Sequence, residues 1–152
     1  MDKAKENRAI QYLKYFQPES EPYYLCYSGG KDSDCIRILA ELAGVEHECK
    51  HNLTTVDAPE TVYYVRETIG KENICVPDIS MWKLIVKKKI PPTRIARYCC
   101  SEMKERGGKG RVKITGVRWD ESAARKESTD VVKVIGKEKT MQKLAEERGG
   151  GL

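Results

Sequence analysis

The stretch that decides the fold is Tyr23-Tyr24-Leu25-Cys26-Tyr27-Ser28-Gly29-Gly30-Lys31-Asp32-Ser33. Its first five residues form a nearly unbroken apolar run, which is typical of a parallel strand buried on both faces. From Ile36 to Ala43 apolar residues recur at helical spacing, and Gly44 ends that pattern. The sequence therefore predicts a strand that enters a helix through a glycine turn at residues 28–33.

The alternation of strand and helix continues on both sides of this unit. Hydrophobic periodicity and Gly or Pro boundaries predict helices over 3–16, 59–69, 81–88 and 95–106, and strands within 45–54, 74–76 and 112–117. Strands that alternate with helices of this length favour a parallel sheet covered by helices. We therefore predict a three-layer α/β/α fold with a doubly wound, mostly parallel sheet of Rossmann-like type.

The length of 152 residues indicates a single domain. Within it we expect an N-terminal helix and turn at 1–21, a core at 22–126 that carries the site, and a C-terminal extension at 127–152. The chain has no apolar run of the ~20 residues that span a bilayer, and its first residues lack the apolar segment of a signal peptide. The six cysteines form no Cys-x-x-Cys pair and are expected to be free thiols. These features predict a soluble, cytoplasmic protein with no membrane partner.

Positive charge is concentrated in residues 83–126. This segment holds fourteen Lys or Arg and four Asp or Glu, so its balance is 14 − 4 = +10. Because the whole chain carries +5, the remainder carries 5 − 10 = −5. Such a segment favours an anionic ligand, for example a nucleic acid. The alternative is a solvated surface of lysines, and Lys87-Lys88-Lys89 fits either a nucleic-acid contact or a solvated helix end.

Residues 28–33 have the composition of a phosphate cradle. A strand that enters a helix through two glycines exposes backbone N–H groups at a helix N-terminus, where the helix dipole also favours negative charge. Gly29 and Gly30 allow positive φ and a close approach of phosphate oxygens. Further donors to a phosphate are the side chains of Ser28, Lys31 and Ser33.

Asp32 does not fit a simple phosphate cradle, because a carboxylate repels a phosphate. It is explained either as a helix cap or as a ligand for Mg²⁺ that bridges to the phosphates. The loop has neither the G-x-x-x-x-G-K-[ST] spacing of a Walker loop nor G-x-G-x-x-G. It reads Ser-Gly-Gly-x-Asp-Ser, and the alternative to a phosphate site is an ordinary glycine turn.

Three segments together resemble the phosphoadenylyl-sulfate (PAPS) reductase family, in the adenine nucleotide alpha-hydrolase-like (PP-loop) superfamily. They are the loop at 28–33, Pro59-Glu60-Thr61, and the stretch Arg97-Tyr98-Cys99-Cys100-Ser101-Glu102-Met103-Lys104 followed by Gly116-Val117-Arg118-Trp119-Asp120-Glu121-Ser122 and Arg125. The resemblance implies a PP-loop type of fold that binds an adenine nucleotide at the carboxyl ends of the strands.

The resemblance also assigns roles to single residues. It implies that loop 28–33 holds phosphate or sulfate and that Arg118 and Arg125 pair with anionic oxygens, although routine surface ion pairs would also explain these arginines. Glu121 would orient Arg118 or coordinate a metal. Thr54 would contact the nucleotide, but it stands in Leu53-Thr54-Thr55, where the family usually has an Asp-Thr-Gly turn, so contacts there are altered.

Two departures from the family concern cysteine. The reductase nucleophile lies in a C-terminal cysteine motif, whereas no cysteine follows Cys100 in this chain. The candidates for a catalytic role are therefore Asp32, Cys99 and Cys100. The tandem cysteines resemble half of a [4Fe–4S] motif of which the other half is missing, so a cluster in this chain is doubtful. They are equally explained as two small apolar residues of a helix.

Three functions follow as hypotheses. The first is a PAPS reductase-like enzyme, an oxidoreductase or transferase of sulfur metabolism that binds PAPS or adenosine bisphosphate and uses a thiol reductant protein. The second is an enzyme that uses ATP and Mg²⁺ to adenylate an acceptor, such as a nucleic acid undergoing sulfur modification. The third is a nucleotide-binding module without catalysis. The sequence leaves the oligomeric state open.

Overall fold

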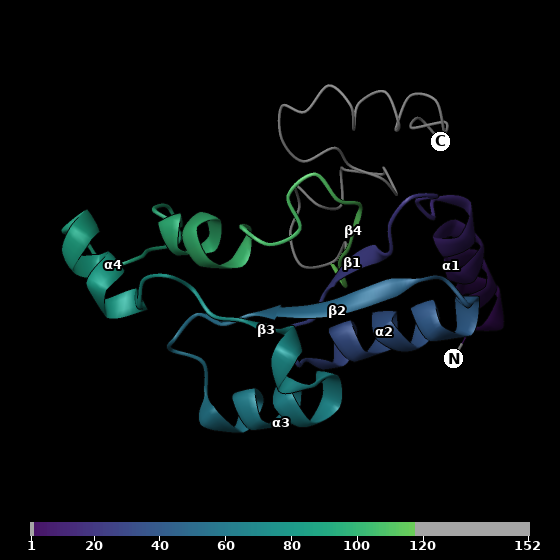
Figure 1. Cartoon of the computed structure of the whole chain (residues 1–152), viewed down its shortest axis with the longest axis horizontal. Coiled ribbons are helices and arrows are strands. Elements are labelled where there is room, and N and C mark those ends of the chain that lie inside the picture. Colours follow the sequence, from purple (N-terminus) through teal and green to yellow (C-terminus); the bar gives the residue numbers. More distant parts are fainter. Residues whose placement is uncertain (1, 118–152) are drawn as a thin grey trace. The chain divides into compact units, whose positions relative to one another are not determined.

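A parallel sheet forms the centre of the computed structural model, which describes residues 2–117 (Figure 1). Its four strands lie in the order β3-β2-β1-β4. The strands are β1 (Tyr23–Cys26), β2 (His47–Asn52), β3 (Ile74–Cys75) and β4 (Lys113–Ile114). Leu25 lies beside Cys49 of β2 on one side and Ile114 of β4 on the other. Because every pairing is parallel, the carboxyl ends of all four strands face the same edge of the sheet.

The helices begin and end at residues suited to those positions. Asp2 caps the first helix by accepting the Ala4 N–H, and Ser80 caps the fourth by accepting the Lys83 N–H. Gly44 ends the second helix at a φ of 65°, a left-handed conformation that favours glycine. The helices are α1 (Lys3–Tyr15), α2 (Lys31–Ala43), α3 (Pro59–Ile69) and α4 (Met81–Lys88), with a short 3₁₀ turn at Lys71–Asn73 and a π-helix, η2, at Cys100–Lys104.

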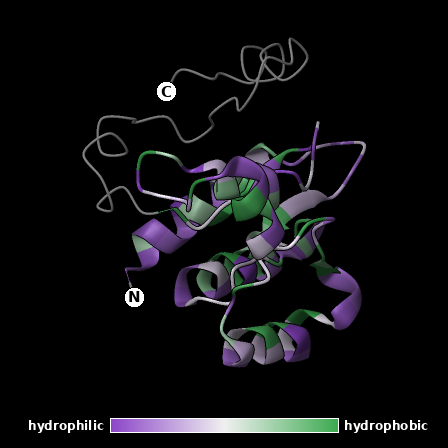
Figure 2. Ribbon diagram, turned by 90° about the vertical axis from the view of Figure 1, so that its left-hand side faces the viewer, coloured by the Kyte–Doolittle hydropathy of each residue, from purple (hydrophilic) through white to green (hydrophobic). Residues whose placement is uncertain are grey.

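The main core lies between one face of the sheet and helices α1, α2 and α3. Tyr23, Leu25 and Tyr27 alternate along β1 and point to this face, where Ala40 of α2 and Val65 of α3 pack against them. Leu25 and Val65 are fully buried. The hydroxyl of Tyr23 also donates to the Leu13 carbonyl of α1 at 2.9 Å. Figure 2 shows hydrophobic segments in the centre of the molecule and hydrophilic ones toward the outside.

A glycine loop covers Tyr24 on the other face of the sheet. The backbone of Gly107 and Gly108 lies against the Tyr24 ring, and a Cβ on Gly108 would stand 2.6 Å from its Cγ atom. Arg111 and Lys113 lie over the same ring, 5.5 and 5.9 Å from its centroid. The parallel sheet and its flanking helices are confirmed, while the three-layer, doubly wound arrangement stays a prediction.

A second, smaller core forms around α4 and η2. Met81 and Leu84 of α4 are buried together with Met103 of η2, and Tyr98 packs against them. Two hydrogen bonds connect this cluster to residues at or just after the carboxyl end of β2. The Met81 N–H donates to Thr55 Oγ1 at 2.9 Å, and Asn52 Nδ2 donates to the Lys104 carbonyl at 2.8 Å. The second core is therefore attached at the carboxyl edge of the sheet.

The predicted helix over 95–106 is wrong in its extent. Arg94 and Ile95 form a bend, because the Ala96 N–H donates to Thr93 Oγ1 and the Thr93 N–H donates to the Ala96 carbonyl. Helical backbone begins only at Tyr98 and continues as a π-helix, in which Met103 is buried. The predicted strand at 112–117 is likewise reduced to Lys113–Ile114. By contrast, the boundaries predicted for α3 and α4 are confirmed.

Residues Met1–Thr115 form one compact unit, so the N-terminal helix belongs to the same unit as the sheet. No helix within the described residues has the length and apolar character needed to cross a bilayer.

Candidate functional site

Loop 28–33 joins the carboxyl end of β1 to the first turn of α2. Since β2 pairs with β1, the loop that follows β2, residues 53–58, begins at the same edge of the sheet. The first N–H groups of α2 have no acceptor inside the helix, and the helix dipole places partial positive charge there. The structure thus has the elements of an anion site where the sequence predicts one.

Ser33 holds the loop in shape. Its side chain is buried, its hydroxyl donates to the Gly30 carbonyl at 2.7 Å, and the Gly30 N–H donates back to Ser33 Oγ at 3.1 Å. The hydroxyl of Ser28 lies 3.2 Å from the same oxygen. Ser33 therefore closes the turn within the protein, whereas Ser28 is exposed and lies at the start of the loop.

The two glycines of the loop meet different surroundings. Gly29 has a φ of +77°, and a Cβ there would stand 2.7 Å from Val65 Cγ2 and 3.4 Å from Thr61 Cγ2. Gly30 has an extended backbone, and a Cβ there would meet only Ser28 Oγ, at 3.6 Å. Packing against α3 is thus sufficient to explain Gly29. It does not explain Gly30, which faces an open approach to the N-terminus of α2.

Two charged residues follow in the first turn of α2. Lys31 is exposed and Asp32 is half-buried. The N-cap of α2 is Gly30, so the explanation of Asp32 as the cap of this helix is wrong. Its alternative role as a Mg²⁺ ligand stays a prediction.

Asp34, which was not among the predicted site residues, directly follows loop 28–33 in the first turns of α2. Asp34 accepts hydrogen bonds from the hydroxyls of Tyr27, at 2.5 Å, and Tyr64, at 3.0 Å. It thereby joins the end of β1 to α2 and α3. Burial, followed by the hydrogen bond to Asp34, raises the pKa of Tyr27 well above its ordinary value. The sequence pattern around Asp34 could not indicate this role, because its partner Tyr64 lies thirty residues away in the chain.

The loop after β2 is also internally bonded. Thr54 is buried, and its N–H donates to Asp57 Oδ2 at 2.6 Å. Thr55 has a φ of 65°, and this places its hydroxyl at the start of α4. At the end of β2, His51 is buried and its Nδ1–H donates to the Tyr27 carbonyl at 2.9 Å. The structure therefore places Thr54 at the same edge as loop 28–33, on a loop held by Asp57.

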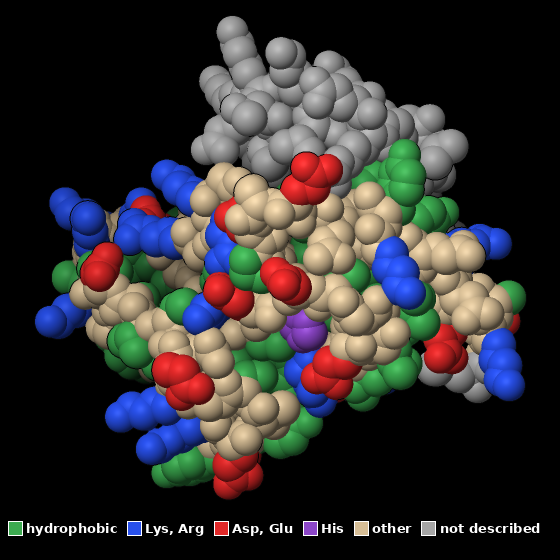
Figure 3. Space-filling view, turned by 45° about the vertical axis from the view of Figure 1, so that its right-hand side comes forward, with side chains coloured by type: hydrophobic (Ala, Val, Ile, Leu, Met, Phe, Trp, Pro, Cys, Tyr) green, Lys and Arg blue, Asp and Glu red, His purple; other side chains and the backbone are tan. Residues whose placement is uncertain are grey.

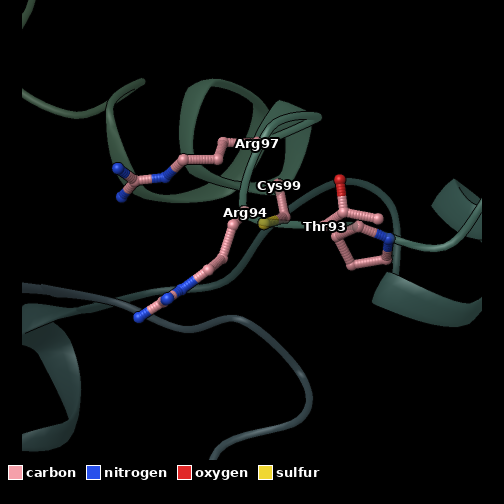
Figure 4. Close-up of a pocket in the computed structure, with 5 residues that line it drawn as sticks. Thr93, Arg94, Arg97 and Cys99 are labelled. Atoms are coloured by element: carbon pink, nitrogen blue, oxygen red, sulfur yellow. The ribbon is translucent and has the colours of Figure 1, made fainter.

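The tandem cysteines lie in the second core, next to two arginines. A pocket of about 520 Å³ is lined by Pro92, Thr93, Arg94, Arg97 and Cys99. Figure 4 shows the side chains of Arg94 and Arg97 extending in the same direction, with the Cys99 sulfur near their bases. Arg97 also donates from Nη2 to Cys100 Sγ at 3.6 Å. Both thiols are half-buried.

The six cysteines are free thiols, and burial distinguishes them. It raises the pKa of the Cys26 and Cys49 thiols, so these two are poorer nucleophiles at neutral pH. Among the described residues, no three His, Cys, Asp or Glu side chains are placed to hold a metal ion together. An iron–sulfur role for Cys99 and Cys100 has no further support from this part of the chain.

Three of the predicted site residues, Arg118, Glu121 and Arg125, lie outside the described residues. The described part defines the chain as an α/β protein with a parallel sheet and a glycine loop at the carboxyl end of a central strand.

Comparisons with models of known protein families, with curated proteins and with solved structures found no match.

Proposed function

We propose that loop 28–33 binds the phosphate groups of an adenine nucleotide. The observation that carries this proposal is the open approach to Gly30 at the N-terminus of α2, with the exposed side chain of Lys31 beside it. Backbone N–H groups at such a terminus bind phosphate oxygens, and an ammonium group adds charge. The preference for adenine, and a contact from Thr54, rest on the resemblance of the loop to the PP-loop type.

For the reaction, we favour a PAPS reductase-like activity. A cysteine thiolate would attack the sulfur of the sulfate group and form an S–S bond, while the bond from sulfur to the phosphate oxygen breaks and adenosine bisphosphate leaves. A thiol of a reductant protein would then attack the cysteine sulfur, so that sulfite leaves with the electron pair and a disulfide forms. Cys99 and Cys100 are the candidates, because Arg94 and Arg97 beside them would attract an anionic substrate.

A second candidate is adenylation with ATP and Mg²⁺. In that reaction an acceptor attacks the α-phosphorus and pyrophosphate leaves, so that the protein contributes positioning and charge neutralisation. The observation that favours it is Asp32 in the first turn of α2, where a carboxylate suits a Mg²⁺ ion better than a sulfate. A nucleotide-binding module without catalysis is the third candidate. We place each of them in the cytoplasm, where six free thiols would stay reduced.

Thermal unfolding with different nucleotides tests the proposal. A ligand at 100 times its Kd adds about 2.7 kcal/mol to the free energy of unfolding. Stabilisation by PAPS or adenosine bisphosphate supports the reductase-like function and leads to an assay for thiol-dependent sulfite release. Stabilisation by ATP with Mg²⁺ alone supports adenylation, to be followed as pyrophosphate release that needs an acceptor. No stabilisation by any adenine nucleotide, or equal stabilisation by GTP, would contradict the proposal.

A further inference from the structure

We propose that the exposed face of α4 and the turn after it bind a single-stranded nucleic acid. We call this region the basic surface, and define it by Trp82, Lys83, Val86, Lys87, Lys89, Arg94 and Arg97. It lies apart from loop 28–33 in the sequence and belongs to the second core. Arg94 and Arg97 are shared with the Cys99 pocket of the proposed reaction, but the inference does not depend on nucleotide binding by loop 28–33.

The charge of this region is unbalanced. Residues 81–98 contain six Lys or Arg and no Asp or Glu. Within the described part of the chain, Lys88 alone of these six has a carboxylate partner, Glu102 at 3.3 Å. Figure 3 shows several Lys and Arg side chains projecting from the left-hand edge of the face it presents, whereas the middle of that face mixes acidic and basic groups. Five cations on one short segment, none with a carboxylate partner among residues 2–117, suit a polyanion.

The exposed face of α4 places an aromatic ring beside these cations. The side chain of Trp82 is 69% exposed, and that of Val86, one turn later, is 77% exposed. Lys83 and Lys87 form the adjacent row at the same spacing of four residues, and both are exposed. A ring flanked by cations is the arrangement that stacks on an unpaired base while the ammonium groups meet the neighbouring phosphates. Bases within a duplex do not offer such a stacking face.

The pocket after α4 supplies a place for a phosphate. Arg94 and Arg97 extend in the same direction at its edge, and no carboxylate lines it (Figure 4). The turn between them is held by the two hydrogen bonds between Thr93 and Ala96, at 2.9 and 3.2 Å. Each guanidinium group offers planar, bidentate contacts of the kind that pair with the oxygens of a phosphodiester.

A lipid surface fits this region less well. Helices that lie in a membrane interface bury a wide apolar face opposite a charged one. On α4, the exposed apolar side chains form a single row, Trp82 and Val86, next to the lysine row, and the helix has only eight residues. Within the helix this apolar row is bounded by the lysine row, and the exposed Ile90 and Ile95 lie in the turn after it, between Lys89 and Arg97 in the sequence.

The test uses the full chain and fluorescence anisotropy with labelled single-stranded DNA and RNA oligonucleotides at several salt concentrations. Trp82→Ala is expected to weaken binding roughly 5- to 150-fold, the range of one lost base–aromatic stack. The double variant Lys83→Gln/Lys87→Gln is expected to reduce the slope of log K against log salt by about 1.4, since each contact on a single strand contributes ~0.7.

Matched controls are Tyr63→Ala, which removes an exposed aromatic ring of α3, and Lys3→Gln/Lys14→Gln, which removes two exposed charges of α1. Both should leave binding nearly unchanged, and thermal unfolding should show every variant folded. Equal losses in the control variants, no binding at all, equal or tighter binding to a duplex, or tighter binding to anionic phosphatidylserine vesicles would each overturn the inference. Nucleotide stabilisation at loop 28–33 should persist in Trp82→Ala, so the two proposals can fail separately.

Discussion

A Cβ on Gly29 would stand 2.7 Å from Val65 Cγ2, so α3 packs directly against the glycine loop. Val65 is itself fully buried. The same loop leaves Gly30 open on the side of the α2 N-terminus. A substitution at Gly29 therefore tests packing against α3, whereas one at Gly30 tests ligand binding.

Gly29→Ala should lower the free energy of unfolding by about 2–4 kcal/mol, because a left-handed backbone and a crowded side chain both add cost. Gly30→Ala should change stability by less than about 1 kcal/mol, since the added methyl group meets no close atom. Denaturant unfolding measures both. If Gly30→Ala also abolishes nucleotide stabilisation, phosphate approaches that residue; undiminished stabilisation would count against a phosphate site here.

Asp34→Ala should destabilise the fold by about 1–3 kcal/mol, because it leaves the buried Tyr27 hydroxyl without its acceptor. Tyr64→Phe removes a hydrogen bond that is exposed and should cost less, roughly 0.5–1.5 kcal/mol. A double-mutant cycle between Tyr27→Phe and Asp34→Ala measures the coupling. Additive effects of these two substitutions would show that the bond does not hold β1 to α2.

Alkaline pH should unfold the protein through its buried tyrosines. Burial raises the pKa of Tyr24 from 10.0 to about 12, and that of Tyr27 is raised as well. Between pH 10 and 12 the unfolded chain loses protons that the folded state keeps, so stability is complete below pH 10 and falls as pH rises. Tyr24→Phe should flatten this decline. Absorbance of tyrosinate should show late titration of Tyr24 and Tyr27.

Thiol labelling should separate the cysteines by burial. Cys35 and Cys75 are exposed and should react with a neutral reagent such as iodoacetamide before Cys26 and Cys49, whose pKa values are raised by burial. Mass spectrometry of peptides after a short exposure gives the order. Denaturant should remove the difference, which serves as the control. Early labelling of Cys26 in the folded state would contradict its half-buried position in the central strand β1.

Ser33→Ala should weaken nucleotide binding and stability together. The substitution removes the hydroxyl that joins both polar groups of Gly30, so the loop loses its fixed shape, and a cost of about 1–2 kcal/mol is expected. Ser28→Ala is the matched control for stability, since Ser28 is exposed and its hydroxyl is hydrogen-bonded to Ser33 alone among the described residues. A stable Ser33→Ala variant would show that the serine is not needed for the turn.

The sequence by itself determined where β1, the glycine turn and helices α1 to α4 lie, because these depend on local periodicity and on residues such as Pro59, Gly44 and Gly70 at helix ends. It also located loop 28–33 from its composition. The helix at 95–106 could not be predicted correctly, because the bend at Arg94 and Ile95 depends on a side-chain bond from Thr93 that competes with helical hydrogen bonding.

Tertiary structure decided which residues meet. Asp34 contacts Tyr27 and Tyr64, and Gly29 contacts Val65, across gaps in sequence that no spacing pattern predicts. It also decided that Trp82 is exposed rather than buried, since the buried positions of α4 are taken by Met81 and Leu84. The physical reason is that local sequence fixes backbone conformation, whereas contacts between distant segments depend on how the faces of helices and sheet pack together.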